Sequence, residues 1–183
     1  MIRQCRISRV VSVTVPKGCL VRDKVQSAYK IPRSVLVLIH TQDLQVLLME
    51  RAAAPGFWQS VTGSLDSESE SLREAAIREV REETGFDARA YPLEDWNIEN
   101  RFEIFPRWRT RFAPGVIHNL EHVFGLALPA PVEVTLAPDE HSAYEWLPWQ
   151  QAAEKTFSWS NRDAILELPK RHGPRPPRRG GHC

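Results

Sequence analysis

The sequence predicts one domain of the α/β (α+β) class, in which helices pack on a mixed β-sheet. Three observations predict this fold class. The chain has 183 residues, which is the size of a single domain. Its 42% hydrophobic and 26% charged residues are typical of a globular protein and not of a disordered chain. Several β-branched runs surround one strong amphipathic helix, and further helical segments follow near the end.

The first expected elements are strands. Residues 33–40 form a short run rich in β-branched side chains, which is typical of a buried strand. Residues 45–49 form a second apolar run, and the polar link 41–43 is short enough for a hairpin. Residues 57–62 are a third candidate strand, which ends at Gly63. We therefore expect the first two strands to pair with each other.

The clearest element is a helix from about Glu70 to Thr84. It is rich in Ala, Leu, Glu and Arg, and Gly85 suits the left-handed position that ends a helix. The last helix is expected to start at Ser160, with Asp163 three residues on as in a capping box. The other expected elements are strands at 86–91, 96–105, 118–128 and 143–147 and helices at 149–154 and 161–168.

The two ends of the chain differ in composition from its middle. Residues 1–28 predict a basic, poorly ordered N-terminal extension, and residues 169–183, rich in Pro and Gly, predict a disordered basic tail. The domain is expected over residues 29–168. Residues 31–168 hold 12 basic and 22 acidic side chains. Because such an acidic domain repels phosphate backbones, a passive nucleic-acid binder is excluded, and an anionic substrate would need cations between it and the protein.

No membrane or thiol chemistry is expected. The longest apolar stretch, Val35–Ile39, is far shorter than the roughly 20 residues of a membrane-spanning helix, so we expect a soluble protein. We further expect it to be cytoplasmic and to be a monomer or a weak homo-oligomer. The cysteines lie at positions 5, 19 and 183, in the end segments. The domain itself therefore has no thiol for a disulfide, a zinc site or nucleophilic catalysis.

The predicted helix places two acids on its inner face. On a helical wheel, Glu79 and Glu83 fall into the apolar stripe, whereas Glu82 lies at its edge and Arg78 lies on the more exposed side. The stripe is formed by Leu72, Ala75, Ala76 and Val80. Two like charges at i and i+4 repel, and burying them adds a desolvation cost that a cation must offset. Clustered carboxylates select a hard divalent ion such as Mg²⁺.

Residues 70–86 also carry a known pattern. Glu70, followed after seven residues by Arg78-Glu79-Val80-Arg81-Glu82-Glu83-Thr84-Gly85-Phe86, resembles the Nudix box at each fixed position, with Phe86 where an aliphatic residue is usual. Six residues, not five, separate Gly63 from Glu70. Either the loop has one extra residue or Ser64 takes the glycine position.

The resemblance to the Nudix family implies a fold and an activity. It implies an αβα sandwich in which the box helix packs against the mixed sheet, and a Mg²⁺-dependent hydrolase. Further segments resemble those members of the family that split 7,8-dihydroneopterin 3'-triphosphate into the monophosphate and pyrophosphate for folate biosynthesis. These segments are residues 57–64, 102–105, 111–116, 139–147 and 158–162.

The resemblance also assigns site residues. Glu79 and Glu83 would be metal ligands, Glu82 a further catalytic group, and Glu140 a third metal ligand or the general base. Glu70 would orient the box through Arg78. The substrate would contact Lys30, Arg51, Thr62, Phe102, Glu103, Ile104, Phe105 and Ser158. Lys30 and Arg51 suit phosphate as cations near strand ends, and Phe102 and Phe105 would offer a flat wall to a ring.

Two alternatives stay open at this point. The box fixes phosphate chemistry but not the leaving group, so a housekeeping hydrolase of (deoxy)nucleoside triphosphates such as dATP or oxidised nucleotides is the first. A catalytically silent Nudix fold that only binds a ligand is the second. His141, beside Glu140, is expected to be structural, and residues 107–112 are expected to form a loop that helps to hold triphosphate or a solvated edge strand.

Overall fold

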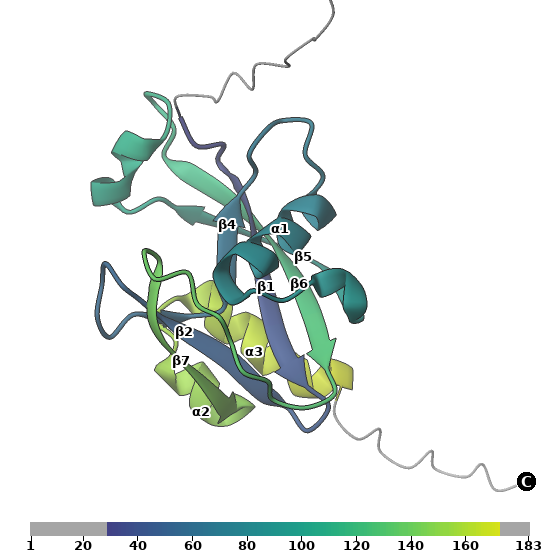
Figure 1. Cartoon of the computed structure of the whole chain (residues 1–183). Coiled ribbons are helices and arrows are strands. Elements are labelled where there is room, and N and C mark those ends of the chain that lie inside the picture. Colours follow the sequence, from purple (N-terminus) through teal and green to yellow (C-terminus); the bar gives the residue numbers. More distant parts are fainter. Residues whose placement is uncertain (1–28, 173–183) are drawn as a thin grey trace, which may run out of the picture.

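The computed structural model describes residues 29–172, so the predicted extension 1–28 lies outside the described residues (Figure 1). Its strands are β1 (Arg33–Thr41), β2 (Gln45–Arg51), β3 (Trp58–Gln59), β4 (Val61–Ser64), β5 (Leu93–Glu103), β6 (His118–Leu128) and β7 (His141–Pro148). Its helices are α1 (Leu72–Thr84), α2 (Trp149–Lys155) and α3 (Trp159–His172), with 3₁₀ turns η1 (Ala88–Ala90) and η2 (Pro106–Arg111). No helix within this part of the chain is long and apolar enough to cross a bilayer.

Strand β1 is the centre of a seven-stranded mixed sheet. It pairs in parallel with β6 along its whole length and antiparallel with β4 from Ser34 to Val37. The predicted hairpin forms, but β1 and β2 pair only near the turn, where His40 lies opposite Val46. Strand β5 extends the sheet beyond β6, and β7 and β3 pair with β2. The predicted mixed sheet is therefore confirmed.

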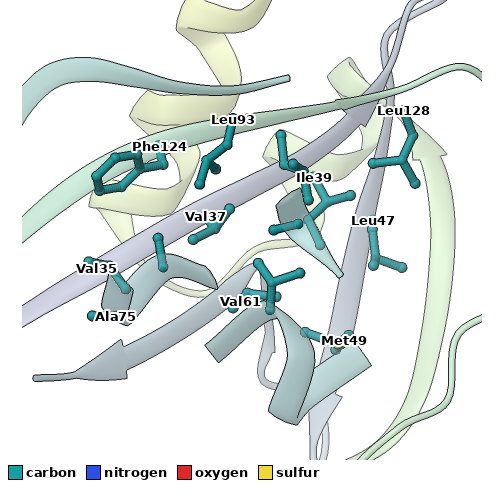
Figure 2. Close-up of a cluster of buried hydrophobic side chains, with 14 of the residues drawn as sticks. Val35, Val37, Ile39, Leu47, Met49, Val61, Ala75, Leu93, Phe124 and Leu128 are labelled. Atoms are coloured by element: carbon teal, nitrogen blue, oxygen red, sulfur yellow. The ribbon is translucent and has the colours of Figure 1, made fainter. Parts of the chain in front are cut away.

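Helices cover both faces of the sheet. Because successive strand residues point to opposite faces, Val35 and Val37 pack on one face while Leu36 and Leu38 pack on the other. The first face is covered by α1, and the side chains of its core are drawn in Figure 2. The second face is covered by α2 and α3. This burial on both sides explains the continuous apolar run of β1 and confirms the αβα sandwich.

Three local features differ from the predictions. Residues 86–91 were expected to form a strand, but Ala88–Ala90 form a 3₁₀ turn because the Asp87 carboxylate accepts from the backbone N–H of Arg89 at 3.1 Å. Helix α3 begins one residue before the expected cap: Ser158 Oγ, not Ser160, accepts from the backbone N–H of Asn161 at 3.2 Å. The same helix runs to His172, so residues 169–172 of the predicted tail are helical. The remaining tail, residues 173–183, lies outside the described residues.

A buried histidine makes the stability of the fold depend on pH. His40 is 1% exposed and packs on the ring of His172 with centroids 4.6 Å apart. Burial lowers its pKa to about 4, and the opposing effects of the Thr41 carbonyl and Glu94 do not restore it. Below about pH 6.5 His40 is protonated in the unfolded chain but stays neutral in the native state until about pH 4. Acidification therefore stabilises the unfolded chain relative to the native state.

We expect His40 to account for about 2 kcal/mol of lost stability between pH 7 and pH 5. Urea unfolding of the wild type and of His40→Gln at both pH values measures this contribution. The variant should lose less stability on acidification than the wild type does. Equal losses in the two proteins would contradict the assignment.

Candidate active site

A cavity of about 580 Å³ is bordered by β1, β4, β5, β6, η2 and the start of α3. It brings together all of the predicted substrate residues, which are Lys30, Arg51, Thr62, Phe102, Glu103, Ile104, Phe105 and Ser158. Glu83 and Glu140 also line it, whereas Glu79 and Glu82 do not. The cavity thus brings Glu83 of the box helix together with residues from distant parts of the chain.

Helix α1 turns its acids inward as its spacing predicts. A capping box at Ser71 and Glu74 starts the helix, and Gly85 ends it with a φ of 77°. Between these ends Glu79 is 8% exposed and Glu83 is 1% exposed, both among buried alanines and Val80. Two carboxylates on one buried face need positive charge nearby.

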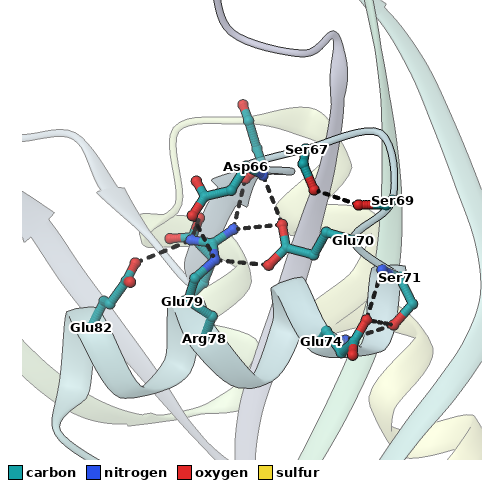
Figure 3. Close-up of polar contacts among 10 residues, drawn as sticks. Asp66, Ser67, Ser69, Glu70, Ser71, Glu74, Arg78, Glu79 and Glu82 are labelled. Carbon is teal, nitrogen blue, oxygen red and sulfur yellow. Dashed lines mark hydrogen bonds and ion pairs between the residues drawn. The ribbon is translucent and has the colours of Figure 1, made fainter. Parts of the chain in front are cut away.

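Arg78 supplies part of that charge (Figure 3). Its Nε donates to Glu70 at 2.9 Å, its Nη1 to Glu79 at 2.7 Å, and its Nη2 to the backbone carbonyl of Ser64 at 2.9 Å. Glu82 lies on the outer side of the same guanidinium, 3.1 Å from Nη1. One side chain therefore ties the loop before α1 to the helix and holds Glu79 in place.

This network differs in part from the sequence expectation. Arg78 was expected on the more exposed side of the helix, but it is half-buried among the acids, and Glu74 binds Ser71 in the capping box. Glu70 does contact Arg78, as the resemblance implied. Burial raises the pKa of Glu79 to about 7, although the Arg78 charge opposes it.

Steric crowding explains why position 63, before the helix, is a glycine. A Cβ placed on Gly63 would lie 1.8 Å from the carboxyl carbon of Glu79, so no side chain fits there in this arrangement. Ser64, by contrast, uses its carbonyl to bind Arg78. Gly63 thus occupies the glycine position of the box, and the loop to Glu70 contains one extra residue.

A second acidic group forms where α1 meets the start of β7. Glu83 Oε2 lies 3.0 Å from Nε2 of His141, and the ligand atoms of Glu83, Glu140 and His141 all lie within 4.8 Å of one another. Burial raises the pKa of Glu83, and the Glu140 charge adds to this, while His141 opposes it. Among residues 29–172 this is the group of side chains whose donors are arranged to hold a metal ion.

His141 was expected to be structural, yet it is buried directly against Glu83. Its position follows from the pairing of β2 with β7, which sets His141 opposite Arg51. The backbone carbonyl of Glu140 accepts from the N–H of Ala52 at 2.9 Å, at the same end of β2. Proximity to Glu140 in sequence was the only signal that could have pointed to His141.

Cations face these acids across the cavity. Burial lowers the pKa of Lys30, and the neighbouring Arg111 lowers it further, while Glu79 and Glu140 act in the opposite direction. Burial also lowers the pKa of Arg51, against the effect of Glu83. The Arg51 guanidinium lies over the ring of Trp108 at 5.6 Å. Trp108 and Arg111 come from the 107–112 segment, which forms η2 and not an edge strand.

The NUDIX domain model matches residues 30–168. The chain belongs to the Nudix family. As a Nudix hydrolase it is expected to need a divalent metal, and its donor set fits one: the two carboxylates provide hard oxygen ligands, and His141 beside them offsets the burial of the Glu83 charge only in part.

Relatives of this Nudix hydrolase carry a more specific name. It is 47% identical to dihydroneopterin triphosphate diphosphatase of Escherichia coli K12 over 150 residues, which cover 80% of the chain and 96% of the relative. Identity to the Haemophilus influenzae protein of the same name is 40% over 142 residues, 75% of the chain and 87% of the relative. The solved structure of the E. coli dihydroneopterin triphosphate pyrophosphohydrolase matches with a TM-score of 0.72 at 46% identity, covering 77% of this chain and 97% of that one.

Proposed function

We propose that this protein hydrolyses 7,8-dihydroneopterin 3'-triphosphate to the monophosphate and pyrophosphate, with Mg²⁺, in tetrahydrofolate biosynthesis. The observation that carries the proposal is the 47% identity to the E. coli diphosphatase across 96% of that protein. At this coverage the similarity extends over the whole domain and not only over the box helix.

The charges of the cavity support binding of a triphosphate. Lys30 lies close enough to Glu79 and Glu140, and Arg51 close enough to Glu83 and Glu140, for their charges to interact. Guanidinium and ammonium groups bind phosphate oxygens strongly when they are partly withdrawn from water. The phosphates would therefore bind between these cations and the acids, while residues Phe102 to Phe105 line the same cavity as an apolar wall for the ring.

The acids divide into two roles. Glu79 and Glu83 would hold Mg²⁺, which when bound neutralises phosphate charge and makes water a better nucleophile at neutral pH. The Nε2–H of His141 donates to Glu83 and fixes the direction of its carboxylate. Glu140 is exposed at the cavity and is the proposed base that takes the proton of the attacking water. Arg78 holds Glu79 and Glu82 at fixed positions around the site.

A substrate panel tests the proposal. Purified protein should release pyrophosphate and the monophosphate from 7,8-dihydroneopterin triphosphate, with products identified by phosphorus NMR, and chelation of Mg²⁺ should stop the reaction. Orthophosphate as the only phosphorus product, or no turnover, would contradict the proposal. A higher kcat/KM for dATP or 8-oxo-dGTP would favour the housekeeping nucleotide hydrolase instead.

A further inference from the structure

One part of the cavity wall consists of residues that are not among the proposed metal ligands, the proposed base or the phosphate-binding cations. It is built from Asn119 and Glu121 on β6 and from Ser160 and Asn161 in the first turn of α3, and all four side chains line the cavity. They are buried: Glu121 is 6% exposed and Asn161 is 0% exposed. Neither the Nudix box nor the resemblance assigns any of them a role, although Ser160 and Asn161 lie in the segment 158–162 that carries part of the resemblance.

Three polar atoms of this wall lack hydrogen-bond partners within the described residues. Asn119 uses its Nδ2 to donate to Ser34 Oγ at 2.6 Å, which leaves its Oδ1 unpartnered. Asn161 accepts with its Oδ1 from Ser60 Oγ at 3.1 Å, which leaves its Nδ2 unpartnered. Glu121 leaves its Oε1 unpartnered. A buried polar atom without a partner is unfavourable, so three such atoms in residues that line one cavity indicate a ligand that pairs with them.

The sheet places an aromatic ring beside these atoms. In the pairing of β5 with β6, Phe102 lies opposite Asn119, and Asn100 lies opposite Glu121. Residues 119 and 121 are two apart on one strand and therefore point to the same face. The unpartnered atoms thus adjoin a flat apolar side chain, which is the usual arrangement for binding a planar heterocycle.

The charge of Glu121 also fits a ligand rich in N–H groups. Burial raises the pKa of Glu121, and the hydrogen bonds from Ser160 and Asn100 offset this only in part. N–H donors of a ligand would stabilise the charged carboxylate, because hydrogen bonds to an ionised group are stronger than those between neutral groups.

We propose that Asn119, Glu121 and Asn161 bind the 2-amino-4-oxo-pyrimidine edge of the ring, the edge that a pterin shares with guanine. This edge presents a ring N–H, an amine and one carbonyl, whereas the wall presents two acceptors and one donor. The inference rests on the proposed function for the choice of a pterin. It names the side chains that select the ring, which the box does not specify. An adenine edge presents no carbonyl and only one donor group, so it leaves part of the wall unpaired.

Glu121→Gln tests this assignment, because it keeps the shape of the side chain and replaces one acceptor with a donor. Binding of neopterin, which has no phosphate, should weaken by about 10- to 100-fold when followed by its fluorescence. The ratio of kcat/KM for dGTP to that for dATP should fall by at least about 10-fold, since glutamine pairs well with an adenine edge. Inhibition by inorganic tripolyphosphate should stay as in the wild type.

Two further variants keep the test sharp. Asn161→Asp can still accept from Ser60 but loses the donor, so it should also weaken neopterin binding. Glu99→Gln makes the same exchange as Glu121→Gln at an exposed position of β5 that does not line the cavity, and it should bind neopterin normally. Equal losses for dGTP and dATP in Glu121→Gln, or unchanged neopterin binding, would overturn the inference.

The two levels of the hypothesis fail separately. If the wild type releases pyrophosphate from 7,8-dihydroneopterin triphosphate but Glu121→Gln keeps its selectivity, only the ring-binding inference is lost. If the wild type does not turn this compound over yet binds neopterin in a manner that depends on Glu121, the proposed reaction is lost and the ring site stands.

Discussion

Glu83→Gln should lower kcat for a triphosphate substrate by at least about 1,000-fold while the protein stays folded. Glu83 is the most deeply placed acid of the site: it is 1% exposed, accepts from His141 at 3.0 Å and lies 3.4 Å from the backbone N–H of Thr62. Glutamine has the same shape but no charge, so the site would lose a carboxylate that a divalent cation needs. Titration calorimetry should show Mg²⁺ affinity lowered by at least about 10-fold.

The same substitution should leave the melting temperature unchanged or raise it. Burial raises the pKa of Glu83, and replacing such a carboxylate with a neutral group removes a desolvation cost. Glu74→Gln is the matched control on the same helix, since glutamine also serves in a capping box and Glu74 is exposed. A folded Glu83→Gln protein that keeps more than about a tenth of wild-type activity would contradict the role of Glu83. Its expected inactivity would instead exclude a catalytically silent module.

Arg78→Ala should lower the free energy of unfolding by about 3 kcal/mol. The change leaves Glu70 and Glu79, whose side chains are 13% and 11% exposed, without their shared partner, and the Ser64 carbonyl loses its hydrogen bond from Arg78. Burial alone would lower the pKa of Arg78, but the Glu70 hydrogen bond and the Glu79 charge raise it above its usual range, which indicates how strongly the acids hold this cation. Urea unfolding at pH 7 measures the loss.

Two further variants distinguish the contribution of the Arg78 hydrogen bonds from the contribution of its positive charge alone. Arg78→Lys keeps the charge but cannot form the fork of hydrogen bonds to three acceptors, so it should fall between the wild type and Arg78→Ala. Arg81→Ala removes an exposed arginine from the same helix and should cost less than about 1 kcal/mol. If Arg78→Ala were as stable as Arg81→Ala, the network would contribute nothing to folding.

Elements with local signals were predictable from the sequence. The inward acids of α1 follow from the helical spacing of positions 79 and 83, and β1 and β6 follow from their apolar runs. The prediction of a strand at 86–91 was wrong because the composition of this segment favours a strand, whereas the Asp87 carboxylate accepts a hydrogen bond from the backbone N–H of Arg89 and stabilises a turn. Ser160 matched a capping pattern, yet Ser158 is the residue that caps the helix.

The site was predictable only as far as a family pattern covers it. His141 reaches Glu83 through the pairing of β2 with β7, a contact between distant segments that no spacing rule encodes. Asn119, Glu121 and Asn161 are single polar residues in otherwise ordinary elements. Their shared position depends on the register of β5 with β6 and on the residue at which α3 begins. Such positions become visible only when tertiary structure is known.

The first turn of α3, which closes one side of the cavity, has a consequence for biosynthesis of the protein. A ribosome releases the chain from its N-terminus, so the acidic helix leaves the exit tunnel well before residues 158–161 do. Until then β6 can pair with β1, but the proposed compartment for the ring lacks the side that Ser160 and Asn161 form. A nascent chain can thus carry its complete signature motif before it can select a substrate.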